Sequence, residues 1–281
     1  MSLKTKRGLE TCLFFGVTHT FSLPVTTKDG VEIFNPKNES SYHKSHAVAY
    51  KRSNLGLRIH SCTGEKFLQI VNAFSDGIHF ITGESLRSQY VIFGNGYSHD
   101  SSTDIRGWAP FPFEAAADDK ALALCLERLP VLIPLNLNST FNRVSNSLRF
   151  YDLGQSSESP DLALMSYVSS LEGLFSVSNT ELSFRLSLTI SKFLEDKSES
   201  QKALFKQLRD LYVVRSKLSH GDKICSDEEQ AGIQLAEYWV PFAAEIAWRC
   251  NQKLVKDNLI SMFNSKKDHA AFLDALIFKQ S

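Results

Sequence analysis

Three consecutive segments in the second half of this 281-residue chain each combine a helix-start signal with helical periodicity. Each opens with a serine three residues before a glutamate or glutamine, which is the spacing of a capping box. The pairs are Ser178 with Glu181, Ser198 with Gln201, and Ser226 with Glu229. Because short turns between amphipathic helices make them pack antiparallel, with their apolar stripes against one another, these segments predict a helical bundle.

The bundle prediction extends in both directions along the chain. Ser159 and Pro160 are suited to the first positions of a helix that reaches Phe175. Gly221 occupies the position of a C-terminal glycine cap, and Pro241 is expected to kink the last long helix. Prolines at 130 and 134 predict that an earlier helix ends near Leu129.

Up to about residue 115 the sequence instead alternates short apolar stretches with turn residues. This pattern predicts strands in THTFSLPV, VEIFN, LGLRIHSC, IHFITGES and QYVIFGNG. The exception is EKFLQIVNAFSDG, residues 65–77, whose apolar positions recur at helical spacing. A segment with one glycine and two prolines, 104–114, separates the two patterns.

The fold class predicted from these patterns is α+β. We expect a mainly-strand α+β domain over 1–115, with target sensing as one role open to it, and an all-α bundle over 116–281.

Composition narrows the function classes. The 31 basic and 31 acidic residues balance, so a site for nucleic acid would have to be local rather than a broad basic surface. There is no apolar run of the ~18 residues that suggest a membrane span, and the N-terminus is a poor secretory signal. We therefore expect a soluble, cytoplasmic protein. Its five cysteines are an odd number without a C-x-x-C pair, which favours reduced thiols over disulfides or a zinc site.

One charged residue interrupts the apolar stripe of the segment LYVVRSKLSHG, residues 211–221. At about 100° per residue, Arg215 lies between Leu211 and Leu218 on the face that should be buried. A buried guanidinium cannot neutralise itself, so it needs a carboxylate, a subunit interface or an anionic ligand. Glu172 and Glu181 are the candidate carboxylates for an internal ion pair, and this structural interpretation stays open beside a functional one.

His220 follows Arg215 by five residues and adds a group that titrates near neutrality. An arginine and a histidine together can perform RNA self-cleavage without a metal. The histidine moves the proton of the 2′-hydroxyl or of the leaving 5′-oxygen, and the arginine stabilises charge on the phosphorus. The spacing alone is weak evidence, since it arises easily by chance in a chain with many arginines.

Three motifs in order along the chain provide the context for this pair: SYVSSLEGLF (166–175), ELSFRLSLTISKFLE (181–195) and LYVVRSKLSHG (211–221). Together they resemble the Apea-like branch of the HEPN superfamily (higher eukaryotes and prokaryotes nucleotide-binding). The resemblance covers roughly the last 165 residues and does not extend to residues 1–115.

This resemblance implies a helical bundle that forms a homodimer and brings two Arg/His pairs into one cleft. Active members are metal-independent endoribonucleases, often in toxin or phage-defence systems, and no cofactor or metal is expected. Arg215 would hold the scissile phosphate of an RNA partner, and His220 would act as acid and base. Ser216 stands where many active relatives carry Asn, Asp or His, although serine is usual in the Apea-like branch.

Two further residues are assigned supporting roles by analogy. Glu172 would orient Arg215, and Tyr212 would stack a base or simply pack within the bundle. Because the superfamily also contains inactive members, the alternative function is a non-catalytic module that binds nucleotide or RNA, or that organises the dimer.

Other motifs give weaker signals. His43 and His46 have the spacing of a helical metal pair, but no further ligands are nearby in the sequence. The stretch FGNGYSHD, residues 93–100, lacks the glycine spacing of a phosphate-binding loop and reads as a hairpin turn. No membrane partner is indicated.

Overall fold

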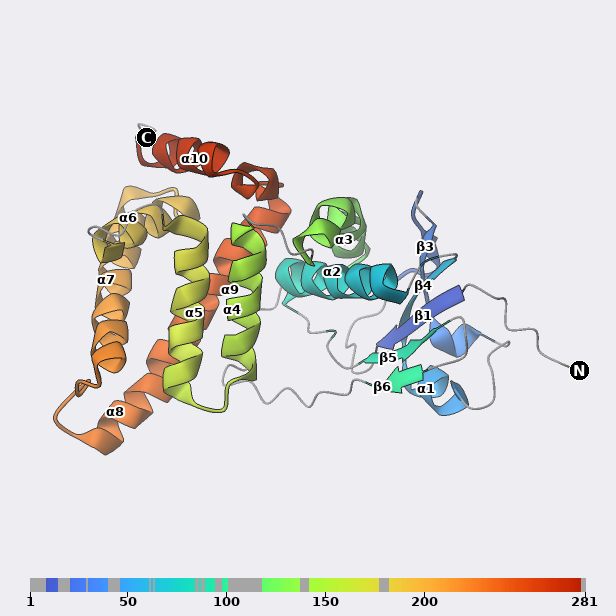
Figure 1. The fold of residues 1–281 in the computed structure, drawn as a ribbon, viewed down its shortest axis with the longest axis horizontal. Coiled ribbons are helices and arrows are strands. Elements are labelled where there is room, and N and C mark those ends of the chain that lie inside the picture. The colour runs from blue at the N-terminus through green and yellow to red at the C-terminus, as the bar shows by residue number, and fades with distance from the viewer. Residues whose placement is uncertain are drawn as a thin grey trace, which may run out of the picture. The chain divides into compact units, whose positions relative to one another are not determined.

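The computed structural model describes residues 9–14, 21–28, 30–39, 46–60, 62, 64–83, 86, 89–93, 98–100, 118–136, 142–176 and 182–278. The chain forms two compact units. One unit comprises Met1–Asp104 with Pro112–Leu137, and the other comprises Ile105–Phe111 with Asn138–Ser281. The first contains a sheet and the second is helical in its described residues, so the predicted α+β class is confirmed (Figure 1).

The sheet of the first unit is antiparallel and has the strand order β2-β3-β4-β1-β5-β6. Its strands are β1 (Leu9–Phe14), β2 (Val25–Thr26), β3 (Val31–Phe34), β4 (Leu55–His60), β5 (Gln89–Ile92) and β6 (Ser98–Asp100). The short helices η1 (Pro36–Asn38) and α1 (Ala47–Arg52) connect β3 to β4. The sequence predicted β3, β4 and β5, but it did not predict β1, which lies between β4 and β5.

Two predicted strands were wrong. In THTFSLPV, residues 18–25, only Val25 lies in a strand (β2); residues 21–24 form none, and 18–20 lie outside the described residues. The stretch IHFITGES begins inside α2 (Gly64–Thr82), which continues well past the predicted helical segment. Residues 78–82 are all buried, so their side chains show no period that separates strand from helix. The helix packs its apolar side on the sheet, where Phe74 meets Phe14 of β1 with ring centroids 5.7 Å apart.

The helix α3 (Asp119–Leu132) belongs to the first unit, whereas the sequence placed the domain boundary at 115/116. Its place beside α2 (Figure 1) depends on Gly77, where a Cβ would come within 2.7 Å of Sγ of Cys125. The helix also continues past Leu129, because Pro130 is accommodated in its last turn before the 3-10 turn η3 (Ile133–Asn136).

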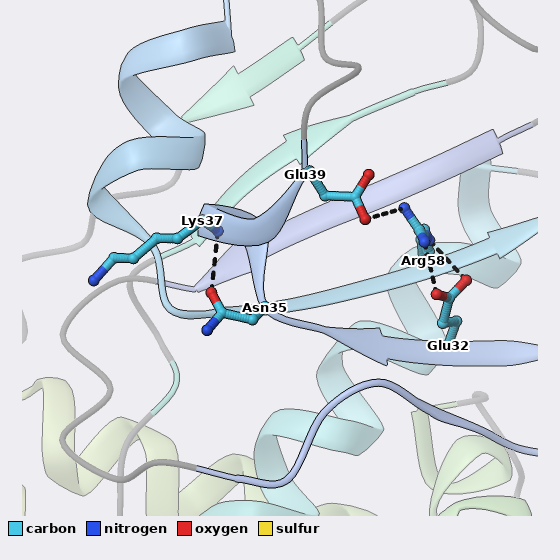
Figure 2. A network of polar contacts seen from close by, with 5 residues as sticks. All are labelled: Glu32, Asn35, Lys37, Glu39 and Arg58. Atoms are coloured by element: carbon cyan, nitrogen blue, oxygen red, sulfur yellow. Dashed lines mark hydrogen bonds and ion pairs between the residues drawn. The ribbon is translucent and has the colours of Figure 1, made fainter.

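Arg58 on β4 contacts two glutamates of the β3–β4 region, Glu32 and Glu39 (Figure 2). Arg58 binds Glu32 through two hydrogen bonds of 2.7 and 2.6 Å, pairs with Glu39 at 3.2 Å, and lies over the ring of Phe34. The ring fits there because Gly56 has no Cβ, which would come within 2.6 Å of it. The hydrogen bonds from Arg58 also lower the pKa of Glu32.

The second unit contains the predicted bundle. Its helices are α4 (Arg143–Ser156), α5 (Pro160–Phe175), α6 (Leu182–Leu194), α7 (Ser198–His220), α8 (Glu228–Gln234), α9 (Val240–Lys256) and α10 (Lys266–Phe278). A π-helical turn, Leu235–Trp239, leads into α9, and the 3-10 turn η5 (Ile260–Phe263) leads into α10. The helix α5 contacts α4, α6, α7 and α9, so it is central in the unit.

The helix ends agree only partly with the predicted caps. Gly221 caps α7 in the left-handed region (φ +72°), and the N–H groups of residues 221 and 222 bind carbonyls of the last turn, as predicted. Asp227, not Ser226, caps α8, and Ser198 is the first residue of α7 rather than its cap. The pair Ser178 and Glu181 lies outside the described residues. Pro241 lies in the first turn of α9, directly after the π-helical turn, so the irregularity precedes the proline.

The packing of α3 on α2 gives a first prediction. Gly77→Ala is expected to lower the free energy of unfolding of the first unit by about 1–3 kcal/mol, because an extra methyl group overfills a packed core. The double variant Gly77→Ala/Cys125→Ala should recover most of this loss, since alanine lacks the sulfur that the new methyl group meets. Urea unfolding followed by circular dichroism measures both effects.

The matched control is Gly232→Ala in α8, where nothing lies within 4 Å of the new methyl group. This change should raise the stability by about 0.5–1 kcal/mol, as expected for a helical glycine. Equal behaviour of the Gly77 and Gly232 variants would contradict the close approach of α2 and α3.

Candidate functional site

The apolar stripe of α7 opens to solvent toward the end of the helix. Leu204, Leu208 and Leu211 are buried, whereas Arg215 and Leu218 are half-buried. The side chain of Arg215 remains 31% exposed, so its guanidinium lies at the edge of the bundle core. This position lets the charge contact both a neighbouring helix and a ligand from solvent.

Glu172 of α5 is the carboxylate that faces Arg215. Nη2 of Arg215 lies 3.6 Å from Oε1 of Glu172, so the two charges form an ion pair, but the distance is too long for a hydrogen bond. The other carboxylate proposed from the sequence, Glu181, lies outside the described residues. The internal ion pair anticipated from the sequence is therefore present, in a loose form.

Three polar atoms at this place are buried and have no hydrogen-bond partner among the described residues. They are Oε1 of Glu172, the hydroxyl oxygen of Tyr212 and Nε of Arg215. A polar atom buried without a partner costs about 1–3 kcal/mol, and native structures contain few of them. Three such atoms therefore belong to residues on two contacting helices, and two of these residues form an ion pair.

Burial and charge shift the pKa values of two of these groups. Burial raises the pKa of Glu172 above its usual value, and the nearby positive charge of Arg215 opposes this shift without cancelling it. Burial also raises the pKa of Tyr212 well above its usual value, and the negative charge of Glu172 adds to the increase. Tyr212 therefore keeps its proton and remains a hydrogen-bond donor.

Tyr212 is only 6% exposed, so its ring packs within the bundle and does not present a face on which a base could stack. Of the two roles considered from the sequence, packing is the one that the structure supports. Its hydroxyl is the part of the site that sequence reasoning missed. The available signal was its spacing, because residues three apart on a helix lie roughly 60° apart and so face the same neighbour.

His220 and Ser216 are exposed, and His220 is the last residue of α7. Five residues at about 100° each place His220 roughly 140° around the helix from Arg215 and about 7.5 Å along it. The pair therefore points in different directions within one chain. Between them, Ser219 donates a hydrogen bond of 2.7 Å to the carbonyl of Arg215, which fixes the last turn of the helix.

The weaker sequence candidates are resolved only in part. His46 is buried and its Nδ1 lies 3.2 Å from the hydroxyl of Tyr90, whereas His43 lies outside the described residues. The strands β5 and β6 pair antiparallel, and residues 94–97 of the predicted turn lie outside the described residues. In the part of the chain that the structure describes, no group of three or more His, Cys, Asp or Glu could hold a metal ion.

A cavity of about 310 Å³ lies between α6 and α10 of the second unit. Apolar side chains such as Phe175, Leu186 and Leu273 form most of its wall, and Arg185 and Asp274 are its charged residues. It shares no lining residue with the cluster around Arg215. Separately, none of the described helices is both long and apolar enough to span a membrane.

Comparison with known proteins gives no relative: no protein-family model, curated protein or solved structure matches this chain.

The raised pKa of Glu172 gives a second prediction. Because the folded protein binds a proton at Glu172 more tightly than the unfolded chain does, ionisation of this group opposes folding. Relative to Glu172→Gln, the wild type should lose stability as the pH rises from the ordinary glutamate pKa through the raised one. Urea unfolding of both proteins across this pH range measures the difference.

Carboxyl NMR of the folded protein gives the Glu172 pKa directly. Arg215→Gln should raise it further, because the charge that now opposes the shift is removed. Arg209→Gln, on the exposed side of the same helix, should leave it unchanged. A pKa of Glu172 at or below the ordinary value would contradict the burial of this carboxyl group.

Proposed function

We propose that this protein is a metal-independent endoribonuclease of HEPN type, which cleaves RNA through Arg215 and His220 in a composite site between two copies of the chain. One observation carries the proposal. Arg215 interrupts an otherwise apolar helix stripe, keeps its Nε without a hydrogen-bond partner in the described structure, and is only loosely paired with Glu172. Because 31% of the side chain is exposed, a phosphate can reach this guanidinium from solvent.

The chemistry needs only the groups already described. Arg215 binds non-bridging oxygens of the scissile phosphate and stabilises the negative charge that develops on them. His220 removes the proton of the 2′-hydroxyl and returns a proton to the leaving 5′-oxygen. The 2′-oxygen forms a bond to phosphorus as the bond from phosphorus to the 5′-oxygen breaks. The products are a 2′,3′-cyclic phosphate end and a 5′-hydroxyl end.

The separation of Arg215 and His220 around α7 favours a site that is shared by two copies. A two-fold arrangement is the usual one for a homodimer, and it would place the exposed His220 of one copy beside the Arg215 of the other. The one cleft between the two copies would then contain two complete Arg/His pairs. The sequence motifs that resemble the Apea-like branch support the same arrangement.

The second candidate function is a non-catalytic module that binds nucleotide or RNA, or that organises a dimer. The observation that favours it is the ion pair itself, because Glu172 already compensates the charge of Arg215. In either case RNA is the proposed partner. We assign the first unit to selecting a target, and the proposed setting is a cytoplasmic toxin or defence system.

The test is cleavage of end-labelled RNA in EDTA by wild type, Arg215→Ala and His220→Ala. Only the wild type is expected to give products with 2′,3′-cyclic phosphate ends, and each variant should lose about 10²–10⁴-fold in rate, as for the loss of an acid–base or electrostatic group. The matched control is Arg209→Ala, which removes an exposed arginine of the same helix and should leave the rate unchanged. Equal cleavage by all four proteins would exclude the nuclease.

Mixing the two inactive variants tests whether the site is shared. A mixed dimer of Arg215→Ala and His220→Ala retains one intact arginine and one intact histidine, on different chains. If they act across the interface, the mixture should regain part of the activity that neither variant has alone. Folded variants that exchange partners and remain inactive when mixed would exclude a site shared between copies.

A further inference from the structure

Phosphate binding by Arg215 would leave Glu172 without its counter-charge inside the bundle. The guanidinium is the cation that faces Glu172, and Oε1 of Glu172 is buried without a hydrogen-bond partner among the described groups. When Arg215 turns toward a phosphate, the carboxylate loses its counter-charge. Removing one partner of a partly buried ion pair is unfavourable, because the buried oxygen of the remaining carboxylate then has no opposite charge beside it.

The hydroxyl of Tyr212 is placed to compensate for this loss. It lies on the same helix as Arg215, one turn earlier and roughly 60° around the helix axis, and α7 contacts α5, the helix of Glu172. Arg215 lies 3.6 Å from Glu172, and the hydroxyl oxygen of Tyr212 and Oε1 of Glu172 are both buried. Burial raises the pKa of Tyr212, and the charge of Glu172 adds to the increase. The hydroxyl has no hydrogen-bond partner in the described structure, so it can donate to the carboxylate without breaking another bond.

We propose that Tyr212 is a positioning residue. Its hydroxyl donates a hydrogen bond to the carboxylate of Glu172 when Arg215 turns to the phosphate of the RNA. The inference rests on the proposed function and assigns Tyr212 a part in it that differs from base stacking. The guanidinium and the phenol hydroxyl are alternative partners of one carboxylate. In the free protein the arginine faces Glu172, and in the RNA complex the tyrosine hydroxyl holds it.

Two features of the cluster make this exchange easy. The ion pair at 3.6 Å contains no hydrogen bond that has to break before Arg215 moves. The raised pKa of Tyr212 keeps the hydroxyl protonated, so that it is a donor throughout the neutral range. The exchange requires no proton transfer between Tyr212 and Glu172, so the charges of both groups stay the same.

The first test needs no RNA. Tyr212→Phe removes only the hydroxyl and keeps the buried ring, so in the wild-type background it should change the folding equilibrium constant little. In an Arg215→Gln background, where the tyrosine alone holds Glu172, the same change should lower this constant by about tenfold or more, as for loss of a hydrogen bond to a charged group. Urea unfolding followed by tryptophan fluorescence measures each variant.

A neutral amide at position 172 is the matched control for this cycle. With Glu172→Gln added, the extra effect of Tyr212→Phe in the Arg215→Gln background should disappear, because no buried charge remains to be held. An equal effect of Tyr212→Phe in all three backgrounds would overturn the proposal. A merely structural tyrosine gives that result, since its contribution to packing does not depend on the charge at position 172.

The second test keeps Arg215 and uses a short 2′-O-methyl RNA oligonucleotide, which lacks the hydroxyl needed for cleavage. Fluorescence anisotropy should show that Tyr212→Phe weakens binding by about tenfold, with the same hydrogen bond now missing from the complex. The double variant Tyr212→Phe/Glu172→Gln should bind at least as tightly as the wild type. Wild-type affinity in the single variant would overturn the proposal, and this measurement remains available if Arg215→Gln does not fold.

The two tests separate this proposal from the proposed function. If the wild type neither binds nor cleaves RNA while the stability cycle shows the coupling, the ribonuclease function fails and only the hydrogen bond from Tyr212 to an unpaired Glu172 stands. If the wild type cleaves RNA but both tests show no coupling, the ribonuclease stands and the role of Tyr212 is wrong.

Discussion

The cost of placing a permanent charge at the edge of an apolar core governs the contact between α5 and α7. Arg215 cannot lose its proton, so the bundle has to offer it a carboxylate, and Glu172 does so from the helix that lies at the centre of the unit. The same burial raises the pKa of Glu172 and so disfavours the charged carboxylate that Arg215 needs as its partner. An apolar pair of similar size would stabilise a bundle as well or better.

Helical periodicity and glycine capping were sufficient to predict most of the second unit, because each signal is local in sequence. The left-handed cap at Gly221 depends only on the absence of a side chain, and it was predicted correctly. The first unit was harder. In β1 and in the last turn of α2, nearly every residue is buried, so no alternation distinguishes strand from helix. The assignment of α3 to the first unit depends on Gly77, whose close contact with Cys125 links residues far apart in the sequence.

The candidate site, too, could be predicted from the sequence only in part. The stripe position of Arg215 follows from periodicity, and Glu172 was one of two carboxylates that the sequence offered. The direction of His220 also follows from helix geometry once the ends of α7 are known. The buried hydroxyl of Tyr212 did not follow, because a tyrosine on an apolar face predicts packing regardless of where its oxygen points. Only a three-dimensional structure shows that this oxygen is buried without a hydrogen-bond partner among the described residues, as Oε1 of Glu172 and Nε of Arg215 are.

The end of α7 places a different kind of requirement on the chain. Nothing lies within 4 Å of the position that a Cβ would occupy at Gly221, so the space there would admit a larger residue. The backbone, with a φ of +72°, does not favour one, because an L-residue is strained in that region. The requirement at position 221 is therefore one of handedness and not of size, and a mirror-image residue would satisfy it as well as glycine. Stereochemistry determines where His220 ends the helix, whereas packing determines where Arg215 lies, so evolution can adjust one without disturbing the other.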